Sequence, residues 1–180
     1  MKKFVFILGG ARSGKSGYAV NLAKKNRKKT VFIATAIASD KEMMERIALH
    51  KASRPRQWEL IEESSEVNLV VERFDRQYGI ILIDCLGLLV SNLLGDGLSE
   101  KDIEKKIKKL INAIRTTGAV VILVSNEVGG GIVPENALAR KFRDILGRAN
   151  QMMAKKADEV IFMQSGIPVF LKKGRRHAKT

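Results

Sequence analysis

Cysteine, proline and long hydrophobic runs are scarce in this chain of 180 residues, and each absence excludes a class of protein. The single cysteine, Cys85, can form no internal disulfide and cannot supply the several thiolates of a structural zinc site. Three prolines and a hydrophobic content of 45% are typical of an ordinary globular domain, which excludes extensive disorder. Apolar runs such as 119–124 are far shorter than the roughly 18 residues of a membrane-spanning helix, so we expect no membrane span.

Acidic and aromatic residues are also few. The 33 Lys and Arg residues outnumber the 19 Asp and Glu residues, which gives a formal net charge of +14. Such an excess is found in proteins that bind nucleic acid, anionic membranes or phosphorylated small molecules, and also in solvated lysine-rich surfaces. Aromatic residues make up 6% of the chain and are not interleaved with basic stretches as they are in single-strand binders. We therefore favour the solvated surface and expect no nucleic-acid partner.

The two ends of the sequence are basic. Met1-Lys2-Lys3 is followed by an apolar stretch that leads directly into Gly9-Gly10 and offers no small-residue cleavage site, so we expect no secretory signal. Together with the single cysteine, this predicts a cytoplasmic protein. Residues 173–180 lack hydrophobic periodicity and are predicted to form a disordered tail, with binding to a polyanion as the alternative.

Short apolar segments rich in Val, Ile and Phe alternate with longer amphipathic segments over residues 1–172. This alternation predicts a single α/β domain with a mostly parallel sheet, helices on both faces and a C-terminal hairpin near 165–168. The predicted strands are Phe4–Leu8, Thr30–Thr35, Gly79–Asp84, Ala119–Ser125, Glu159–Met163 and Val169–Lys172. The predicted helices are Lys15–Lys25, Lys41–Ser53, Glu66–Arg73, Leu86–Leu93, Glu100–Arg115 with Ser99 as its N-cap, and Glu135–Lys156.

A glycine-rich segment between the first strand and the first helix fits the pattern G-x-x-x-x-G-K-[ST]; it reads Gly9-Gly10-Ala11-Arg12-Ser13-Gly14-Lys15-Ser16. The glycines allow successive backbone N–H groups to curl around phosphate oxygens, and the helix N-terminus adds a partial positive charge. Lys15 is then expected to reach the β- and γ-phosphates of a nucleotide, and the Ser16 hydroxyl to be a ligand of Mg²⁺. The sequence therefore predicts a P-loop.

An acidic residue, Asp84, follows the apolar run Ile80–Ile83. Because α/β sheets bind ligands at the carboxyl ends of their strands, Asp84 is predicted to hold the magnesium shell, partly through water. The alternative is an ordinary carboxylate that caps the next helix. The apolar run 119–124 ends similarly in Ser125-Asn126-Glu127, which predicts a second polar cluster in the same crevice.

The predicted helix 41–53 places Glu42, Arg46 and His50 on one face, because they lie four residues apart. An imidazole beside guanidinium groups tends to stay neutral, and a neutral imidazole in a phosphate-binding site can act as a nucleophile in nucleotidyl transfer. Spacing alone does not separate this interpretation from that of an ordinary surface or packing histidine.

Six segments of the sequence occur in the same order in one known family. They are GGARSGKS at 9–16, IATA at 33–36, RIALHKASRPRQW at 46–58, IDCLGLLVSNLL at 83–94, SNEVGGGIVPENALARKFRDILGRANQ at 125–151 and ADEVIFMQSGIPVFLK at 157–172. The chain closely resembles the bifunctional adenosylcobinamide kinase and adenosylcobinamide-phosphate guanylyltransferases of cobalamin biosynthesis. The likeness extends from about Phe4 to Lys172, and the segment at 125–151 is far more specific than a P-loop.

This resemblance implies a RecA-like P-loop fold and a homotrimer with active sites near the subunit contacts. It also implies two reactions on the aminopropanol arm of a corrinoid. The hydroxyl of adenosylcobinamide is first phosphorylated from ATP or GTP, and GMP is then transferred from GTP onto that phosphate to give adenosylcobinamide-GDP. The alternative is a P-loop enzyme of the same fold that retains only one of the two activities.

The resemblance also assigns residues. The family pattern R-I-x-x-H-[KR] falls on Arg46, Ile47, His50 and Lys51, so His50 is expected to become covalently guanylylated. A phosphoramidate on a histidine nitrogen is reactive enough to pass GMP to an incoming phosphate. The nucleotide contacts that the resemblance implies are the P-loop residues and Ala34, Thr35, Ala36, Lys51, Ala52, Ser53, Arg54, Glu62 and Asp84.

The chain departs from the family pattern at Gly87 and Leu88, where Thr and Trp are common, and at Gly130, where Met is common. The change at 87 and 88 removes a hydroxyl and a large ring close to the predicted site, so it affects the expected corrinoid contacts or the kinase step.

Three interpretations concern other residues. Asn126, Glu127 and Arg140 are expected to position the substrate or a neighbouring subunit's loop; the alternative is that Glu127 and Arg140 form structural ion pairs that cap the last long helix. Cys85 is predicted to be a small buried hydrophobe. Trp58 is predicted to be a packing anchor, with a base-stacking platform as the alternative.

Overall fold

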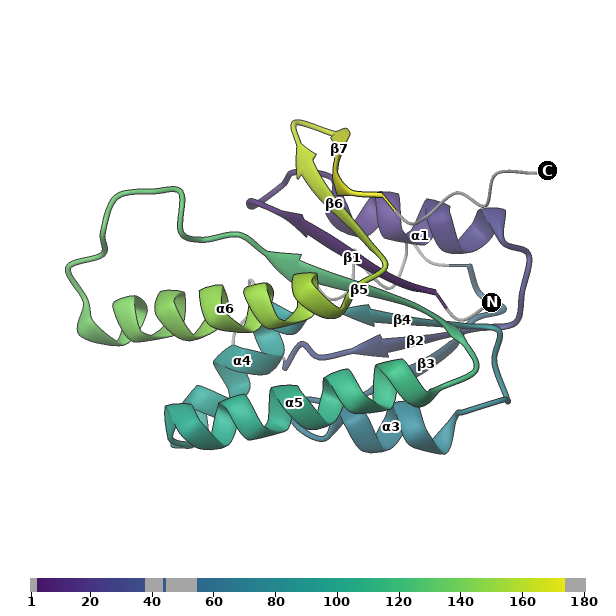
Figure 1. The fold of residues 1–180 in the computed structure, drawn as a ribbon, viewed down its shortest axis with the longest axis horizontal. Coiled ribbons are helices and arrows are strands. Elements are labelled where there is room, and N and C mark those ends of the chain that lie inside the picture. The colour runs from purple at the N-terminus through teal and green to yellow at the C-terminus, as the bar shows by residue number, and fades with distance from the viewer. Residues whose placement is uncertain (1–2, 38–43, 45–54, 174–180) are drawn as a thin grey trace.

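The computed structural model describes residues 3–37, 44 and 55–173, which build one seven-stranded sheet covered by helices (Figure 1). The strand order is β3-β2-β4-β5-β1-β6-β7. The strands are β1 Phe4–Gly9, β2 Thr30–Ala34, β3 Glu59–Glu62, β4 Ile80–Asp84, β5 Val120–Asn126, β6 Glu159–Gln164 and β7 Ile167–Lys172. Every strand runs parallel to its neighbours except β7, which pairs antiparallel with β6.

The helices lie on both faces of the sheet. One face is covered by α1, Lys15–Lys25. The other face carries α3 Val67–Arg73, α4 Leu86–Gly95, α5 Glu100–Thr116 and α6 Ala137–Lys156. Every helix in the described part of the chain is too short or too polar to cross a bilayer. The predicted α/β architecture with helices on both faces is therefore confirmed.

The central strands are apolar along their whole length because both faces are covered. All six residues of β1 are buried, and alternate side chains enter different cores. Phe4 and Phe6 belong to the core under the four helices, whereas Val5 and Ile7 pack on the side of α1. Each such side chain stabilises the fold by about 1.5–3 kcal/mol relative to an exposed one. This double burial is typical of a strand in the interior of the sheet, where β1 lies between β5 and β6.

The structure differs from the prediction at a few elements. Strand β3 was not predicted, because its four residues, ELIE, are mostly exposed at the edge of the sheet and carry no apolar run. Strand β7 begins at Ile167, so the hairpin turn consists of Ser165 and Gly166 alone. Helix α6 begins at Ala137, after Asn136 accepts the N–H of Ala139 at 3.0 Å. The predicted helix Lys41–Ser53 lies outside the described residues except for Met44.

The predicted cap of α5 is confirmed. The hydroxyl of Ser99 accepts the N–H of Asp102 at 3.2 Å and donates to the Asp102 carboxylate at 2.6 Å. This reciprocal pair satisfies one of the free N–H groups at the start of the helix.

Parallel strands place all of their carboxyl ends at the same edge of the sheet. Gly9, the last residue of β1, pairs in register with Asn126 of β5 and with Met163 of β6. Ala34, the last residue of β2, is flanked by Glu62 of β3 and Asp84 of β4. We refer to this side as the carboxyl edge. It carries the loops that follow β1, β2, β4 and β5.

At the opposite edge, a carboxylate connects two loops. Asp75, which follows α3, accepts the Gly118 N–H at 2.7 Å and the Thr117 hydroxyl at 2.9 Å. These hydrogen bonds, led by the one from Gly118, hold the pKa of Asp75 below its ordinary value of 3.8. A carboxyl whose pKa is depressed in the folded state stabilises the fold above its unfolded pKa and loses this effect as the pH falls.

We predict that Asp75→Ala lowers the free energy of unfolding by about 1 kcal/mol at pH 7, because Gly118 and Thr117 lose their acceptor. The difference from wild type should shrink as the pH falls below about 4. Urea denaturation between pH 7 and pH 3 measures both effects. Asp96→Ala, at an exposed carboxylate, is the matched control and should change little. A constant difference across this pH range would contradict the assignment.

Candidate functional site

The glycine-rich segment 9–16 forms the tight connection between β1 and α1 at the carboxyl edge. Two of its residues have left-handed backbones, with φ of 53° at Arg12 and 87° at Gly14. The Ser13 N–H donates to the Gly10 carbonyl at 3.3 Å, and the Tyr18 N–H donates to the Gly14 carbonyl at 2.9 Å. Among the described residues no side chain caps α1, and its first turn holds no acidic residue, which is the arrangement typical of a helix start that binds an anion.

Close packing fixes the start of this loop. A Cβ at Gly9 would lie 2.4 Å from the Ser13 hydroxyl and 2.8 Å from the backbone oxygen of Met163, so only glycine fits. Ser13 is buried, and among the described residues its hydroxyl has no hydrogen-bond partner. The Glu127 N–H donates to the Gly9 carbonyl at 3.0 Å, which joins the loop after β5 to the end of β1. The loop is therefore held from both neighbouring strands.

Lys15 is half-buried at the first position of α1. Its Nζ donates to the Gly10 carbonyl at 3.0 Å, so the ammonium group lies over the loop rather than in open solvent. Burial lowers the pKa of Lys15, and the nearby Cys85 and Asp84 act in the opposite direction. The structure thus places the lysine of the loop within electrostatic reach of the carboxylate that ends β4.

The end of β4 is joined to the end of β2 by one buried hydroxyl. Thr35 is fully buried, and its Oγ1 donates to the Cys85 carbonyl at 2.7 Å and accepts the Cys85 N–H at 2.8 Å. Its own N–H donates to the Asp84 carbonyl at 3.1 Å. The Asn92 amide, from α4, donates to the Thr35 carbonyl at 2.8 Å and to the Ser64 carbonyl at 3.1 Å. These contacts set the path of the backbone at Asp84.

Asn92 was not predicted as a site residue from the sequence. Its only signal is a polar residue inside the apolar helix segment LGLLVSNLLG, which indicates an inward hydrogen bond when the helix packs against a sheet. The buried Cys85 itself agrees with its predicted role as a small hydrophobe, since desolvation raises the pKa of the thiol to about 12.

A second polar network lies at the end of β5, where the sequence predicts it. The hydroxyl of Ser125 donates to the Asn150 side-chain oxygen at 2.7 Å, and the Asn150 amide donates to the Asn126 carbonyl at 3.0 Å. Asn150 lies on α6, so this helix positions the backbone at Asn126. The side chain of Asn126 faces Gly87, where an added Cβ would lie 3.3 Å from its Nδ2. Glycine at 87 therefore leaves Asn126 more room than threonine would.

Glu127 and Arg140 are not paired with each other. The Glu127 carboxylate accepts the Gly129 N–H at 2.6 Å, and the Arg140 guanidinium donates to the backbone oxygens of Pro134 and Glu135 at 2.9 and 2.5 Å. Each side chain shapes the long loop between β5 and α6 through the backbone. Among the described residues neither side chain forms an ion pair, so the structural ion pairs considered from sequence are not found there.

The predicted site residues fall into two groups. The carboxyl edge brings together Asp84, the P-loop residues and, at the ends of β2 and β3, Ala34, Thr35, Ala36 and Glu62. Thr35 contributes through the backbone of Cys85 because its side chain is buried, whereas Glu62 is exposed. His50, Lys51, Ala52, Ser53 and Arg54 lie outside the described residues.

The side chains at this edge can supply part of the coordination of a magnesium ion, and phosphate oxygens and water would have to supply the rest. Within the described part of the chain, no three His, Cys, Asp or Glu side chains are grouped to hold a metal by themselves. One hydroxyl, from Ser16, and one carboxylate, from Asp84, provide hard oxygen donors near Lys15. Mg²⁺ commonly binds through one or two such groups together with phosphate oxygens and water, so the donor set fits this ion.

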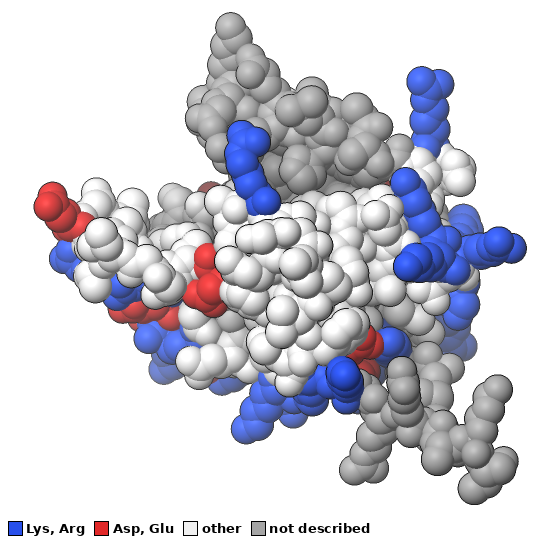
Figure 2. Space-filling view, turned by 90° about the horizontal axis from the view of Figure 1, so that it is seen from above, with Lys and Arg blue, Asp and Glu red and all other residues white. Residues whose placement is uncertain are grey.

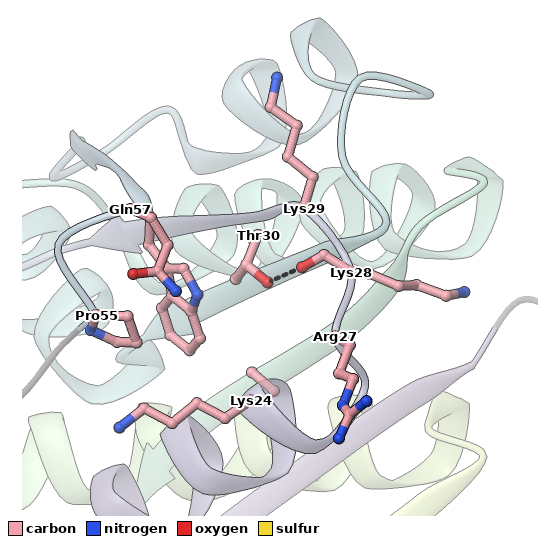
Figure 3. A pocket seen from close by; sticks show the side chains of 9 residues that line it. Lys24, Arg27, Lys28, Lys29, Thr30, Pro55 and Gln57 are labelled. Carbon is pink, nitrogen blue, oxygen red and sulfur yellow. Dashed lines mark hydrogen bonds between the residues drawn. The ribbon is translucent and has the colours of Figure 1, made fainter.

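A separate cavity of about 760 Å³ lies at the opposite edge, where α1 ends and β2 begins (Figure 3). Trp58 lines it and also packs against the core beneath α1, which agrees with the packing role predicted for this residue. Lys24 extends below Pro55, whereas Lys28 and Lys29 point away. The Lys29 ammonium lies 4.3 Å from the ring centre of Tyr78. The basic side chains thus do not converge on one point, and the cavity is not part of the P-loop site.

On the face of the described structure that carries α1, the positive charge is also dispersed. Viewed from the side of the sheet that carries α1, the Lys and Arg side chains are spread around the rim of the described surface, and its middle is largely uncharged (Figure 2). Several cations are paired, such as Lys106 with Glu66 and Arg148 with Glu100. This distribution agrees with the solvated lysine-rich surface expected from sequence.

We predict that Thr35→Val, which keeps the shape of the side chain, lowers the free energy of unfolding by about 2 kcal/mol, because the buried N–H and carbonyl of Cys85 lose their partner. Thr35→Ser keeps the hydroxyl and loses one methyl, so its cost should be about 1 kcal/mol or less. Urea denaturation of the three proteins compares them. A valine variant as stable as the serine variant would show that the hydroxyl is not important for the fold.

The chain is similar in sequence to known proteins along almost its whole length. A sequence model of the family described as cobinamide kinase / cobinamide phosphate guanyltransferase matches residues 5–171. The bifunctional adenosylcobalamin biosynthesis proteins named CobU from Escherichia coli and Salmonella typhimurium are 39% and 41% identical over 180 residues, and each match covers 93% of this chain and 99% of the relative. The protein named CobP from Pseudomonas aeruginosa is 39% identical over 167 residues, which cover 92% of this chain and 95% of the relative.

Solved structures show the fold alone. A KaiC-like protein from Pyrococcus horikoshii has a TM-score of 0.52 at 15% identity, with 89% of this chain and 70% of that chain covered. An ATPase of a bacterial type III secretion system has a TM-score of 0.58 at 13% identity, with 90% and 51% covered. These likenesses confirm the RecA-like P-loop NTPase fold that the resemblance implies. From the family match over almost its whole length, the chain belongs to the cobinamide kinase / cobinamide phosphate guanyltransferase family.

Proposed function

We propose that this protein carries out two successive transfers on a corrinoid. It phosphorylates the aminopropanol hydroxyl of adenosylcobinamide from ATP or GTP and then transfers GMP from GTP onto that phosphate, giving adenosylcobinamide-GDP. The family match and the 39–41% identity to bifunctional relatives support this proposal. The observation that carries it is the placement of Lys15 over the P-loop and within reach of Asp84 at the carboxyl edge.

The proposed nucleotide site lies at the carboxyl edge of the sheet. The N–H groups of residues 9–16 hold phosphate oxygens, and Lys15 neutralises charge on the β- and γ-phosphates. Ser16 and Asp84 hold Mg²⁺, the latter partly through water. When bound, this ion neutralises charge on the phosphates. Thr35 supports Asp84 through the Cys85 backbone, and Ala34, Ala36 and Glu62 border the nucleotide.

In the kinase step, the corrinoid hydroxyl oxygen forms a bond to the γ-phosphorus, loses its proton and displaces a nucleoside diphosphate. In the second step, a ring nitrogen of His50 forms a bond to the α-phosphorus of GTP and pyrophosphate leaves. The phosphate of adenosylcobinamide phosphate then attacks the same phosphorus, which breaks the phosphorus–nitrogen bond and restores the imidazole. Residues Lys51, Ala52, Ser53 and Arg54 contact the nucleotide beside His50.

We further propose that residues 1–172 form one nucleotide-binding domain, followed by a basic tail over 173–180, and that the protein acts in the cytoplasm. The buried thiol of Cys85 fits a reducing compartment. The corrinoid lies near Gly87 and Leu88, where the chain differs from the usual family pattern. Gly87 is buried beside Asn126 at the carboxyl edge, and a threonine there would press on the Asn126 side chain.

The covalent step predicts a labelled protein. Incubation with Mg²⁺ and GTP labelled at the α-phosphate, followed by denaturation, should leave an acid-labile adduct on wild type. His50→Ala should abolish it. The only other histidine, His177, provides a matched control, and His177→Ala should be labelled like wild type. Lys15→Ala should lower labelling at least tenfold, because the triphosphate loses its main charge partner.

An assay of adenosylcobinamide phosphorylation distinguishes an enzyme with both activities from one with a single activity. If His50→Ala still phosphorylates adenosylcobinamide, the two activities are present and separable. A wild-type protein that is labelled but forms no adenosylcobinamide phosphate has only the transferase activity. Label that persists in His50→Ala would contradict the assignment of the nucleophile.

We also propose a homotrimer. Apolar side chains are exposed on β7 and on the loop before α6, including Ile167, which is 65% exposed, Leu171 at 62% and Ile132 at 97%. Exposed apolar side chains that follow one another along a strand, as on β7, are typical of a surface that is covered in an assembly. Light scattering behind a sizing column should give a mass near three times 20.0 kDa. Replacing both Ile167 and Leu171 with Lys should lower that mass, whereas a 20.0 kDa particle for wild type would contradict the proposal.

A further inference from the structure

The turn of the C-terminal hairpin packs directly on the P-loop. The N–H of Gly166 donates to the Ser13 carbonyl at 3.1 Å. An ideal Cβ at Gly14 would lie 3.3 Å from the Cα of Gly166, so the two backbones are nearly in contact. The β6–β7 turn is therefore a third support of the loop, in addition to β1 and the loop after β5.

The conformation of this turn is specific. Ser165 and Gly166 connect the last pair of the hairpin, Gln164 with Ile167, and both have left-handed backbones with φ of 51° and 82°. Two-residue hairpin turns of this kind need positive φ at both central positions. In this geometry the N–H of Gly166 faces the Ser13 carbonyl. Glycine adopts it without strain, whereas a Cβ at this φ is disfavoured.

The hairpin contributes little to the core. Five of the six residues of β7 are exposed, and none is buried. Strand β6 already covers the open side of β1, so the sheet does not need β7 to bury β1. Strand β7 therefore adds little buried surface of its own, and its turn contributes the contact with the P-loop.

We propose that Gly166 is a positioning residue for the nucleotide and that the β6–β7 turn holds the P-loop in its anion-binding form. This inference rests on the proposed nucleotide site. Ser13 and Gly14 lie between the loop's first glycines and Lys15, so a shift of the turn moves the N–H groups that face the phosphates. The turn itself touches no substrate.

The test compares two glycines of similar backbone geometry. Gly166 has φ of 82° and Gly97, after α4, has φ of 79°; at both positions an added Cβ meets no atom within 4 Å. Alanine at either position carries the same left-handed strain, and its effect on folding should therefore be similar. Gly97 donates its N–H to Leu94 within its own turn and is the matched control.

The measurement is the dissociation constant of a fluorescent GTP analogue with Mg²⁺, together with the thermal unfolding midpoint of each variant. Gly166→Ala should raise the dissociation constant at least fivefold, and Gly97→Ala should leave it within twofold of wild type. Both should lower the midpoint by a similar amount. Gly166→Asn should bind within twofold of wild type, because asparagine tolerates left-handed geometry.

Binding is measured well below the lowest midpoint, so that every variant is folded. Equal affinity of Gly166→Ala and wild type would overturn the positioning role while leaving the P-loop site intact. Equal weakening by Gly97→Ala would also overturn it, because the effect would then be one of general stability. Failure of wild type to bind the analogue would instead contradict the proposed nucleotide site, and the positioning role with it.

Discussion

The structure depends on the parallel alignment of β1, β5 and β4, which are buried on both faces. Because these strands run in one direction, Gly9, Asn126 and Asp84 emerge at one edge, and the loops that carry polar groups meet there. A one-residue slip of β1 would exchange Phe6 and Ile7 between two cores of different shape, so burial of the strand also fixes the register of the P-loop.

In the described part of this edge, hydrogen bonds to backbone groups hold the loops. Thr35 binds both backbone groups of Cys85, Asn150 binds the Asn126 carbonyl, and Gly166 binds the Ser13 carbonyl. Such neutral, largely buried hydrogen bonds are weakly affected by salt, and none of these three involves the charged groups of Lys15 or Asp84. This division separates the residues that set the shape of the site from those that carry its charge.

Most of the fold could be predicted from the sequence because its signals are local. The apolar run Ile80–Ile83 and the P-loop pattern each specify an element and its place at the carboxyl edge. Strand β3 has no such signal, because edge strands need not be apolar. The contact between Gly166 and the P-loop joins residues about 150 positions apart, and no local pattern reports it. Spacing leaves the role of His50 open between a nucleophile and an ordinary histidine, and the resemblance favours the nucleophile; its segment lies outside the described residues.

The central claim is that the carboxyl edge binds a nucleoside triphosphate beside the histidine of the 41–53 segment. A crystal structure with Mg²⁺ and a non-hydrolysable GTP analogue tests it most directly. The account predicts the β-phosphate inside residues 9–16, with Lys15 Nζ in contact and the His50 ring facing the α-phosphorus. A triphosphate bound instead in the cavity beside Lys24 and Trp58, with residues 9–16 empty, would contradict it.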